Sequence, residues 1–328
     1  MADVNTLLAR LRDLTHADPS PEQWAHIRAT LDQAPAGDGR ATCVAYAREH
    51  IASWPPEAFP CEVDDFIAGD LPWQALPTAA SFDRACIIND NGVSRLRPPG
   101  WLTPLWASPR LAPLTALSLR FNLLTNADAA DLAASPHPGH LTHLDLSHNN
   151  IGPEGVQALA RSPHLARLTH LNLSSNPLGA EGAAALVAWL EATPAARLER
   201  LELSRAGLGA SGVTTLARSA ALSSLTHLDV TSNRCGPLGA RAIAASPHMS
   251  RLTHLAMGLN AIRDEGAARL ASSPHLGRLV GLKLNNNRIT HEGRRALRES
   301  TRLAALKVLD LKHNLQQART RAPAQGRR

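Results

Sequence analysis

Residues 141–149 read Leu141-Thr-His-Leu-Asp-Leu-Ser-His-Asn149, and this pattern decides the fold. It consists of leucine, two variable residues, leucine, one variable residue, leucine, two variable residues and asparagine. The pattern begins eight times, at Leu114, Leu141, Leu168, Leu198, Leu225, Leu252, Leu279 and Leu306. The step is 27 residues except across one longer repeat, where it is 30 and Ala206 replaces the asparagine. Such a period predicts a solenoid of stacked repeats, each in contact with its neighbours.

Each repeat divides into two elements. The segment Leu-Thr-His-Leu-Asp-Leu-Ser alternates apolar and polar residues, which predicts a strand with one buried face, and segments such as Gly155–Ala160 predict a short helix. Ser-Pro-His follows the helix at Ser135, Ser162, Ser246 and Ser273. Proline ends the helix and turns the chain back, so we expect a parallel sheet on one side and helices on the other.

The asparagine closes each pattern at the turn after the strand. We expect its side chain to bond backbone groups of the turn and to form a ladder between coils, in which an unpaired buried group costs about 1–3 kcal/mol. The ladder residues are Asn122, Asn149, Asn176, Asn233, Asn260, Asn287 and Asn314.

A helical module is expected before the repeats, in residues 1–80 with its linker. Leucines spaced along residues 5–14 predict one helix, and Ser20-Pro21-Glu22-Gln23 starts a second that runs to about Leu31. A third helix is expected over 40–54, then a linker with a short helix near 63–68. Residues 81–113 resemble a degraded capping repeat, in which Phe82, Ala85, Ile87 and Asp90 match the pattern. We expect eight repeats over 114–318 and a disordered basic tail over 319–328.

Charge divides the chain unevenly. Residues 1–80 hold five arginines and no lysine against twelve acidic residues, a net charge of −7. Because the whole chain has a net charge of +6, residues 81–328 carry +13. This polarity favours acidic partners or head-to-tail contact between molecules, although codon bias of a GC-rich genome also explains an excess of arginine over lysine. The four cysteines are spaced neither in pairs nor as metal ligands, and we find neither a signal peptide nor a long apolar run. These features predict a cytoplasmic protein outside the membrane.

The chain resembles leucine-rich repeat proteins over roughly residues 82–314. The strand pattern followed by helical segments such as Ile151–Ala160 is similar to the ribonuclease-inhibitor subtype. The layout, with a helical module before the repeats, is similar to that of bacterial proteins. The resemblance implies an α/β leucine-rich-repeat solenoid, a horseshoe or arc with the parallel sheet on its concave side and the helices on its convex side. It implies binding through the concave face, no catalytic residues and no cofactor.

The residues between the leucines are expected on the concave face. The first row down the stack is Ala116, His143, His170, Arg200, His227, His254, Gly281 and Val308. The second row contains Asp145, Asn172, Glu202, Asp229 and Lys283. The third row contains Arg120 and Lys312. Phe121 and Leu259 lie directly before the asparagine of their repeats. Two interpretations are open: their side chains insert into a partner, or they pack against the turn. These residues predict a polar, histidine-rich binding face that is poor in aromatic side chains.

Two histidine doublets are predicted to lie side by side, His143 with His170 and His227 with His254, on strands about 4.8 Å apart. Three interpretations are open: a metal pair, a pH-sensitive contact favoured by Asp145 and Asp229, or polar surface residues copied with the repeat. We assign no metal site, because a flat row supplies two ligands. Trp189 is expected to fill the core of a lengthened helix.

The sequence therefore predicts a non-catalytic scaffold that binds a protein partner, as an inhibitor or regulator, without a membrane or small-molecule ligand. One alternative is nucleic-acid binding by the basic repeats and the tail from Arg319 to Arg328, although no aromatic residues are interleaved for stacking. A second is GTPase regulation, since a GTPase-activating protein shares this repeat subtype. After Leu311 and Asn314 no capping element follows, so an exposed last strand is expected.

Overall fold

The structure is a computed structural model that describes residues 3–16, 20–34, 42–43, 45–47, 50, 79–81, 102–112, 114–137, 141–193 and 197–315. The chain divides into two compact units, Met1–Asn172 and Leu173–Arg328, which are described separately. The predicted boundaries at residues 80, 113 and 318 stay predictions. The helix expected near 63–68 and the basic tail lie outside the described residues.

The first unit begins with two helices, α1 (Val4–Thr15) and α2 (Pro21–Asp32). Both agree with the predicted spans, and the Ser20 hydroxyl accepts a 3.1 Å bond from the Gln23 N–H at the start of α2. Of the predicted third helix, residues 42–43, 45–47 and 50 are helical and the other positions lie outside the described residues. Leu7, Leu11, Ile27 and Leu31 form the core of this module.

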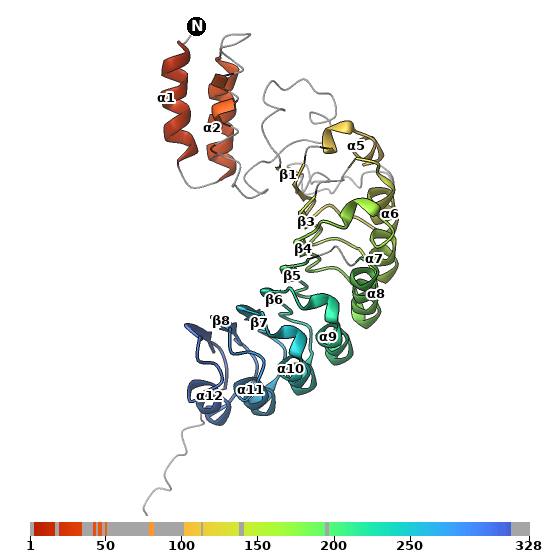
Figure 1. The fold of residues 1–328 in the computed structure, drawn as a ribbon, viewed down its shortest axis with the longest axis vertical. Coiled ribbons are helices and arrows are strands. Elements are labelled where there is room, and N and C mark those ends of the chain that lie inside the picture. Colours follow the sequence, from red (N-terminus) through yellow and green to blue (C-terminus); the bar gives the residue numbers. More distant parts are fainter. Residues whose placement is uncertain are drawn as a thin grey trace, which may run out of the picture. The chain divides into compact units, whose positions relative to one another are not determined.

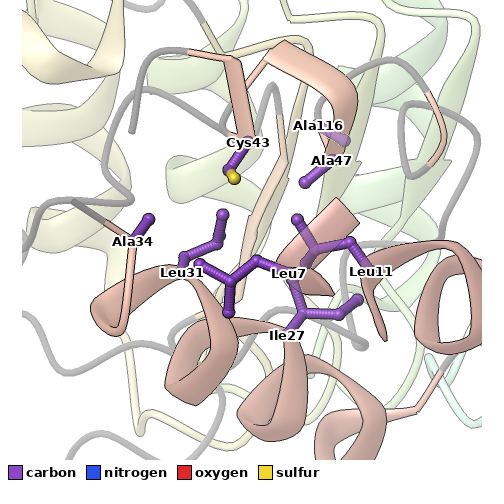
Figure 2. Packing of buried hydrophobic residues seen from close by; sticks show 8 residues of the cluster. All are labelled: Leu7, Leu11, Ile27, Leu31, Ala34, Cys43, Ala47 and Ala116. Carbon is purple, nitrogen blue, oxygen red and sulfur yellow. The ribbon is translucent and has the colours of Figure 1, made fainter. Parts of the chain in front are cut away.

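Figure 2 shows that core, in which Leu7, Leu11, Ile27 and Leu31 point toward one another and toward Cys43 and Ala47. Ala116, from the first full repeat, belongs to the same cluster and is 7 % exposed. Burial in this apolar surrounding raises the pKa of the Cys43 thiol, so the thiol stays protonated. Cys43 is thus a packing residue.

Four parallel strands follow in this unit: β1 (Ala79–Ser81), β2 (Ala116–Ser118), β3 (His143–Asp145) and β4 (His170–Asn172). The intervening helices are α5 (Thr103–Trp106), α6 (Asn126–Ala134) and α7 (Pro153–Leu159), with 3-10 turns η2 (Pro109–Leu111) and η3 (Pro163–Leu165).

One predicted register in the capping repeat is wrong. The pattern aligned Ala85 with Leu117, whereas β1 pairs Ala80 with Leu117, so the strand lies five residues earlier. Phe82, Ala85, Ile87 and Asp90 lie outside the described residues. The degraded repeat lacks the leucines that mark the register elsewhere, and the backbone hydrogen bonds of a strand do not depend on them.

The second unit continues with five parallel strands: β5 (Arg200–Glu202), β6 (His227–Asp229), β7 (His254–Ala256), β8 (Gly281–Lys283) and β9 (Val308–Asp310). Its helices are α8 (Gly179–Ala192), α9 (Gly209–Arg218), α10 (Gly236–Ala245), α11 (Arg263–Ala271) and α12 (His291–Arg298). The 3-10 turns are η4 (Ala220–Leu222) and η5 (Pro247–Met249). Helices α9 to α12 lie on one side of this unit and strands β6 to β8 on the other (Figure 1).

The core of the second unit lies between the strands and the helices. Leu255 and Leu282 of the strands and Leu270 of α11 are at most 1 % exposed, and each buried leucine contributes roughly 1.5–3 kcal/mol. Trp189 is 3 % exposed in α8, the longest of these helices, which confirms that it fills the core. The strand-and-helix alternation confirms the predicted α/β repeat fold.

The serine of the Ser-Pro-His turns is buried and connects successive repeats. The Ser246 hydroxyl donates to the Ala217 carbonyl at the end of the preceding helix and accepts from the His248 N–H. Ser135 and Ser273 donate in the same way to carbonyls 29 residues earlier. The serine therefore satisfies a helix-terminal carbonyl of the neighbouring repeat, in addition to the turn made by the proline.

The last described repeat is less buried than those before it. Val308 is 56 % and Leu315 is 52 % exposed, while Leu309 of β9 is partly exposed and its equivalents in β7 and β8 are buried. Within the described residues, which end at 315 in this region, the prediction of an exposed last strand is confirmed.

Candidate binding face

Outward side chains from the strands form the candidate site. In each three-residue strand from β2 onward the middle leucine points toward the helices and the residues before and after it point away. We call this outward surface the strand face. The paired registers place His143 beside His170, and His227 beside His254, as the sequence predicted.

In the first unit the strand face is connected by polar contacts. The rings of His143 and His170 stack with centroids 4.0 Å apart and planes inclined by 16°. The Asn172 amide donates to Asp145 at 3.0 Å, and the Arg120 guanidinium lies 3.8 Å from the same carboxylate. The Asp145, Asn172 and Arg120 side chains therefore form one cluster.

In the second unit the strand face carries a second stack. His227 and His254 have centroids 4.4 Å apart and nearly parallel planes, inclined by 6°. Next to them Arg200 donates to Glu202 at 2.6 Å. Asp229 accepts the Thr231 N–H at 2.7 Å with one oxygen, so that oxygen holds the turn. Both stacks are thus bordered by carboxylates.

A threonine before each of these histidines holds the ring. Thr253 donates its hydroxyl to the Thr226 carbonyl at 3.1 Å, and the same oxygen lies 3.0 Å from His254 Nδ1. Because the single hydroxyl proton is already used, the geometry assigns the imidazole proton to Nδ1, which leaves Nε2 as an acceptor. Thr226 makes the same pair of contacts, to the Glu199 carbonyl and to His227. This threonine contact was not foreseen, although Thr-His recurs in the pattern.

Burial lowers the pKa of His227 below its ordinary value. Neighbouring His254 and Arg200 lower the pKa further because they oppose a second positive charge, and Glu202 raises it. The net direction favours the neutral imidazole. The sequence predicted that Asp229 would favour the protonated form; at His227 the carboxylate that acts in this direction is Glu202, and desolvation has the larger effect.

A hollow of about 440 Å³ lies on the strand face of the second unit. Six predicted site residues line it: Arg200, Glu202, His227, Asp229, His254 and Lys283. Gly281 and Val308, which the sequence placed in the first row without a role, also line it. The hollow results from small side chains, Ala256 and Gly281, on two neighbouring strands. Residue size along the rows is the signal that would have located it.

The residue before each asparagine has a left-handed backbone. Phe121 and Leu259 both have φ of 58°, and the other repeats have values of 54–59° there. Leu259 is 45 % exposed, whereas the Phe121 ring stacks on His148 with centroids 4.0 Å apart. The structure thus separates the two predicted anchors, since Phe121 packs against the turn and Leu259 is exposed.

Two predicted lysines are exposed on the strand face. Lys283 lies on β8 at the hollow, and Lys312 follows β9, where its backbone N–H donates to Asp310 at 2.9 Å. Only Lys283 lies at the hollow.

The asparagine row lies at the turn and is buried. Asn149 accepts bonds from the N–H groups of Asn122 and Leu124, at 2.9 and 3.0 Å, and donates to the Leu119 and Leu146 carbonyls. The backbone N–H of Asn260 donates to Asn287, and that of Asn287 donates to Asn314. Asn176 bonds carbonyls of its own turn. All seven asparagines are at most 8 % exposed, so their contacts join coils and do not face a partner.

The described residues contain no group of three or more histidine, cysteine or acidic side chains placed to hold a metal ion. Cys235 is buried against Gly239, and burial raises the pKa of its thiol to about 12, so it is a packing residue. Within the same part of the chain, none of the helices combines the length and apolar character that a bilayer crossing requires.

Four segments match the family model of the Leucine Rich repeat, over residues 138–160, 164–187, 221–244 and 248–271. The segment over 138–160 lies in the first unit, the segment over 164–187 crosses into the second, and the other two lie in the second. A comparison with curated proteins found no match. These four segments are therefore similar to leucine-rich repeats, which generally mediate protein–protein interaction.

Proposed function

We propose that this chain binds a protein partner through the strand face, as a non-catalytic inhibitor or regulator. The observation that carries the proposal is the hollow on the second unit, where six of the predicted residues lie around one concave surface. Charged groups of both signs line it, and its histidine rings are held by threonines before any partner arrives. Such preorganisation reduces the entropy lost on binding.

Recognition through charge and hydrogen bonds fits this surface. Lys283 is exposed, and Asp229 uses one carboxylate oxygen for the Thr231 N–H while its second oxygen carries no hydrogen bond or ion pair within the described residues. Complementary charges at an interface set specificity and association rate more than affinity. We expect binding to weaken as salt rises.

The proposal includes the ribonuclease-inhibitor-like subtype, a bacterial source and a cytoplasmic location. Helices of 7–14 residues between the strands of successive full repeats support the subtype. Asp145, Asn172 and Arg120 on the first unit are proposed as a second contact surface of the same kind.

Site-specific photo-cross-linking tests the proposal directly. A photoreactive residue is placed at position 254 on the strand face, and in a second protein at position 241 on α10, which is exposed on the helix side. In lysate of the source organism, we expect a discrete cross-linked protein from position 254 and none from position 241. A cross-link from 241 alone would move the site to the helices.

A charge variant provides the matched comparison. Asp229→Asn with Lys283→Gln removes both charges but keeps an acceptor for the Thr231 N–H. We expect about tenfold lower recovery of the cross-linked partner, equivalent to two weakened charged contacts. Arg241→Gln should leave recovery unchanged. Equal recovery by both variants would contradict the proposal.

A further inference from the structure

The first row of the second unit contains a gap in an ordered stack of side chains. His227 and His254 are stacked on adjacent strands, and Gly281 occupies the next strand and Val308 the one after it. Strands lie about 4.8 Å apart, so the backbones of residues 254 and 308 are separated by about 9.6 Å. Gly281 contributes no side chain to the space between them.

Glycine is required at 281 by the position of the His254 ring. A Cβ at Gly281 would lie 2.8 Å from His254 Cδ2, closer than real Cβ contacts, and Gly281 is buried beneath that ring. One face of the His254 ring packs on His227. Among the described residues no ring stacks on its other face, which borders the hollow.

The opposite wall of the gap is apolar. Val308, on β9, is 56 % exposed and lines the hollow. A planar ring in contact with both walls needs about 7–8 Å, which is two carbon contacts of about 3.5–4.0 Å each. The backbone spacing of about 9.6 Å across Gly281 is larger than one flat side chain requires, and the His254 ring leans over part of that space.

Charge beside the gap selects among flat side chains. Lys283 follows Gly281 by two residues on β8, is exposed, and makes no ion pair within the described part of the chain. Asp310, its neighbour on β9, uses one oxygen to accept the Lys312 N–H. An ammonium group repels arginine but donates a hydrogen bond to a phenol oxygen.

We propose that the gap above Gly281, between the His254 ring and Val308, binds an aromatic side chain of the protein partner, and that Lys283 selects tyrosine. The inference rests on the proposed function. Tyrosine supplies a ring that extends the stack and a hydroxyl that accepts from Lys283. Aromatic side chains with a polar end are enriched at interface centres, and this face has none of its own among the described strands.

A small probe tests the gap without the partner. N-acetyltyrosinamide is titrated into the full chain, and the methyl resonances of Val308 and the Cδ2–H resonance of His254 are followed by NMR. We expect saturable upfield shifts, several times larger than those caused by N-acetylleucinamide. Shifts no larger than those of the leucine amide would overturn the proposal.

Three variants sharpen the test. Gly281→Ala displaces the His254 ring and should lower the affinity for the tyrosine amide about five- to tenfold. This is the loss expected when one stacked contact is removed. Lys283→Ala should bind the tyrosine amide no better than N-acetylphenylalaninamide. Arg241→Ala on α10 is the control and should change nothing. Unchanged affinity of Gly281→Ala, with a native amide spectrum, would refute the proposed gap.

The outcomes separate this inference from the proposed function. If the tyrosine amide does not bind while cross-linking from position 254 persists, the partner uses the strand face but not the gap. If the amide binds and no partner is cross-linked, the gap stands and the partner proposal fails.

Discussion

The buried turn and the strand face of one repeat differ sharply. Asn260 is fully buried, and it accepts the N–H groups of Asn233 and Cys235 at 3.0 and 3.2 Å while donating to the Val230 and Gly258 carbonyls. His254, six residues earlier, is exposed. Asparagine recurs at the turn because its partners are backbone groups, which every repeat has. Side chains on the strand face have no such constraint, so they vary between repeats, and it is this varying surface for which we propose partner binding.

The longer repeat shows what happens without the asparagine. The N–H groups of Ala206 and Leu208 still donate to Asn233, at 3.1 Å each, so the following coil stays bonded. Toward the preceding coil the side-chain acceptor is missing, and Leu178 donates instead to the Asn176 carbonyl at 2.9 Å. Glycines at 207 and 209 supply left-handed turns there. The exception is tolerated because local backbone bonds replace those of the side chain.

The largest effect is expected at the buried turn. Asn260→Ala leaves two N–H and two carbonyl groups without the side chain and should lower the free energy of unfolding by about 3 kcal/mol or more. Urea denaturation followed by circular dichroism measures the loss. Asn285→Ala, on the partly exposed third row, is the matched control and should change stability by less than about 0.5 kcal/mol. Equal losses in both variants would remove the distinction between turn and face.

A smaller effect is expected at the turn between helix and strand. Ser246→Ala removes the bond to the Ala217 carbonyl and the acceptor of the His248 N–H, with a loss of about 1–2 kcal/mol. Ser250→Ala, exposed at the end of η5, serves as control in the same denaturation assay. If Ser246→Ala were as stable as that control, the hydrogen bond between Ser246 and Ala217 would not contribute to the free energy of unfolding.

On the strand face, Thr253→Val should change ring order more than stability. It removes the hydroxyl between the Thr226 carbonyl and His254 and costs about 1 kcal/mol or less, because the site is partly exposed. We expect the His254 ring resonances to broaden or shift, and the tyrosine amide to bind more weakly. Thr231→Val, whose hydroxyl bonds no imidazole, is the comparison. Unchanged His254 resonances would show that stacking alone orders the ring.

The smallest expected effect is the pH dependence of stability. Because the pKa of His227 is lowered in the fold, the unfolded chain takes up the proton first as pH falls below about 6.5. The contribution of neutral His227 is complete above that pH and declines as pH falls through its folded pKa. His227→Gln should therefore flatten the fall in unfolding free energy between pH 7 and pH 5. If the free energy of unfolding fell more steeply with pH in the variant, the pKa of His227 would be raised by folding and not lowered.

Sequence reasoning succeeded where one residue type has one structural role. Ser20 with Pro21 located the start of α2, and Leu255 in its pattern located a buried strand position. It failed at β1, where weak apolar residues left the register undetermined. It also missed Ser246 as a connector between repeats, because the donor and acceptor lie 29 residues apart.

The period, the two elements of each repeat, the pairing of the histidines and the outward position of each row were determined by the sequence alone. Those features depend on alternation and on chemical identity, which repeat at a constant step. The tertiary structure decided that His227 and His254 stack in parallel, that Thr253 orients the ring, and that Gly281 and Val308 border a gap. These features depend on side-chain rotamers and on the spacing between coils, because the stack and the gap arise from residues about 27 positions apart and Thr253 is itself held by the Thr226 carbonyl of the preceding coil.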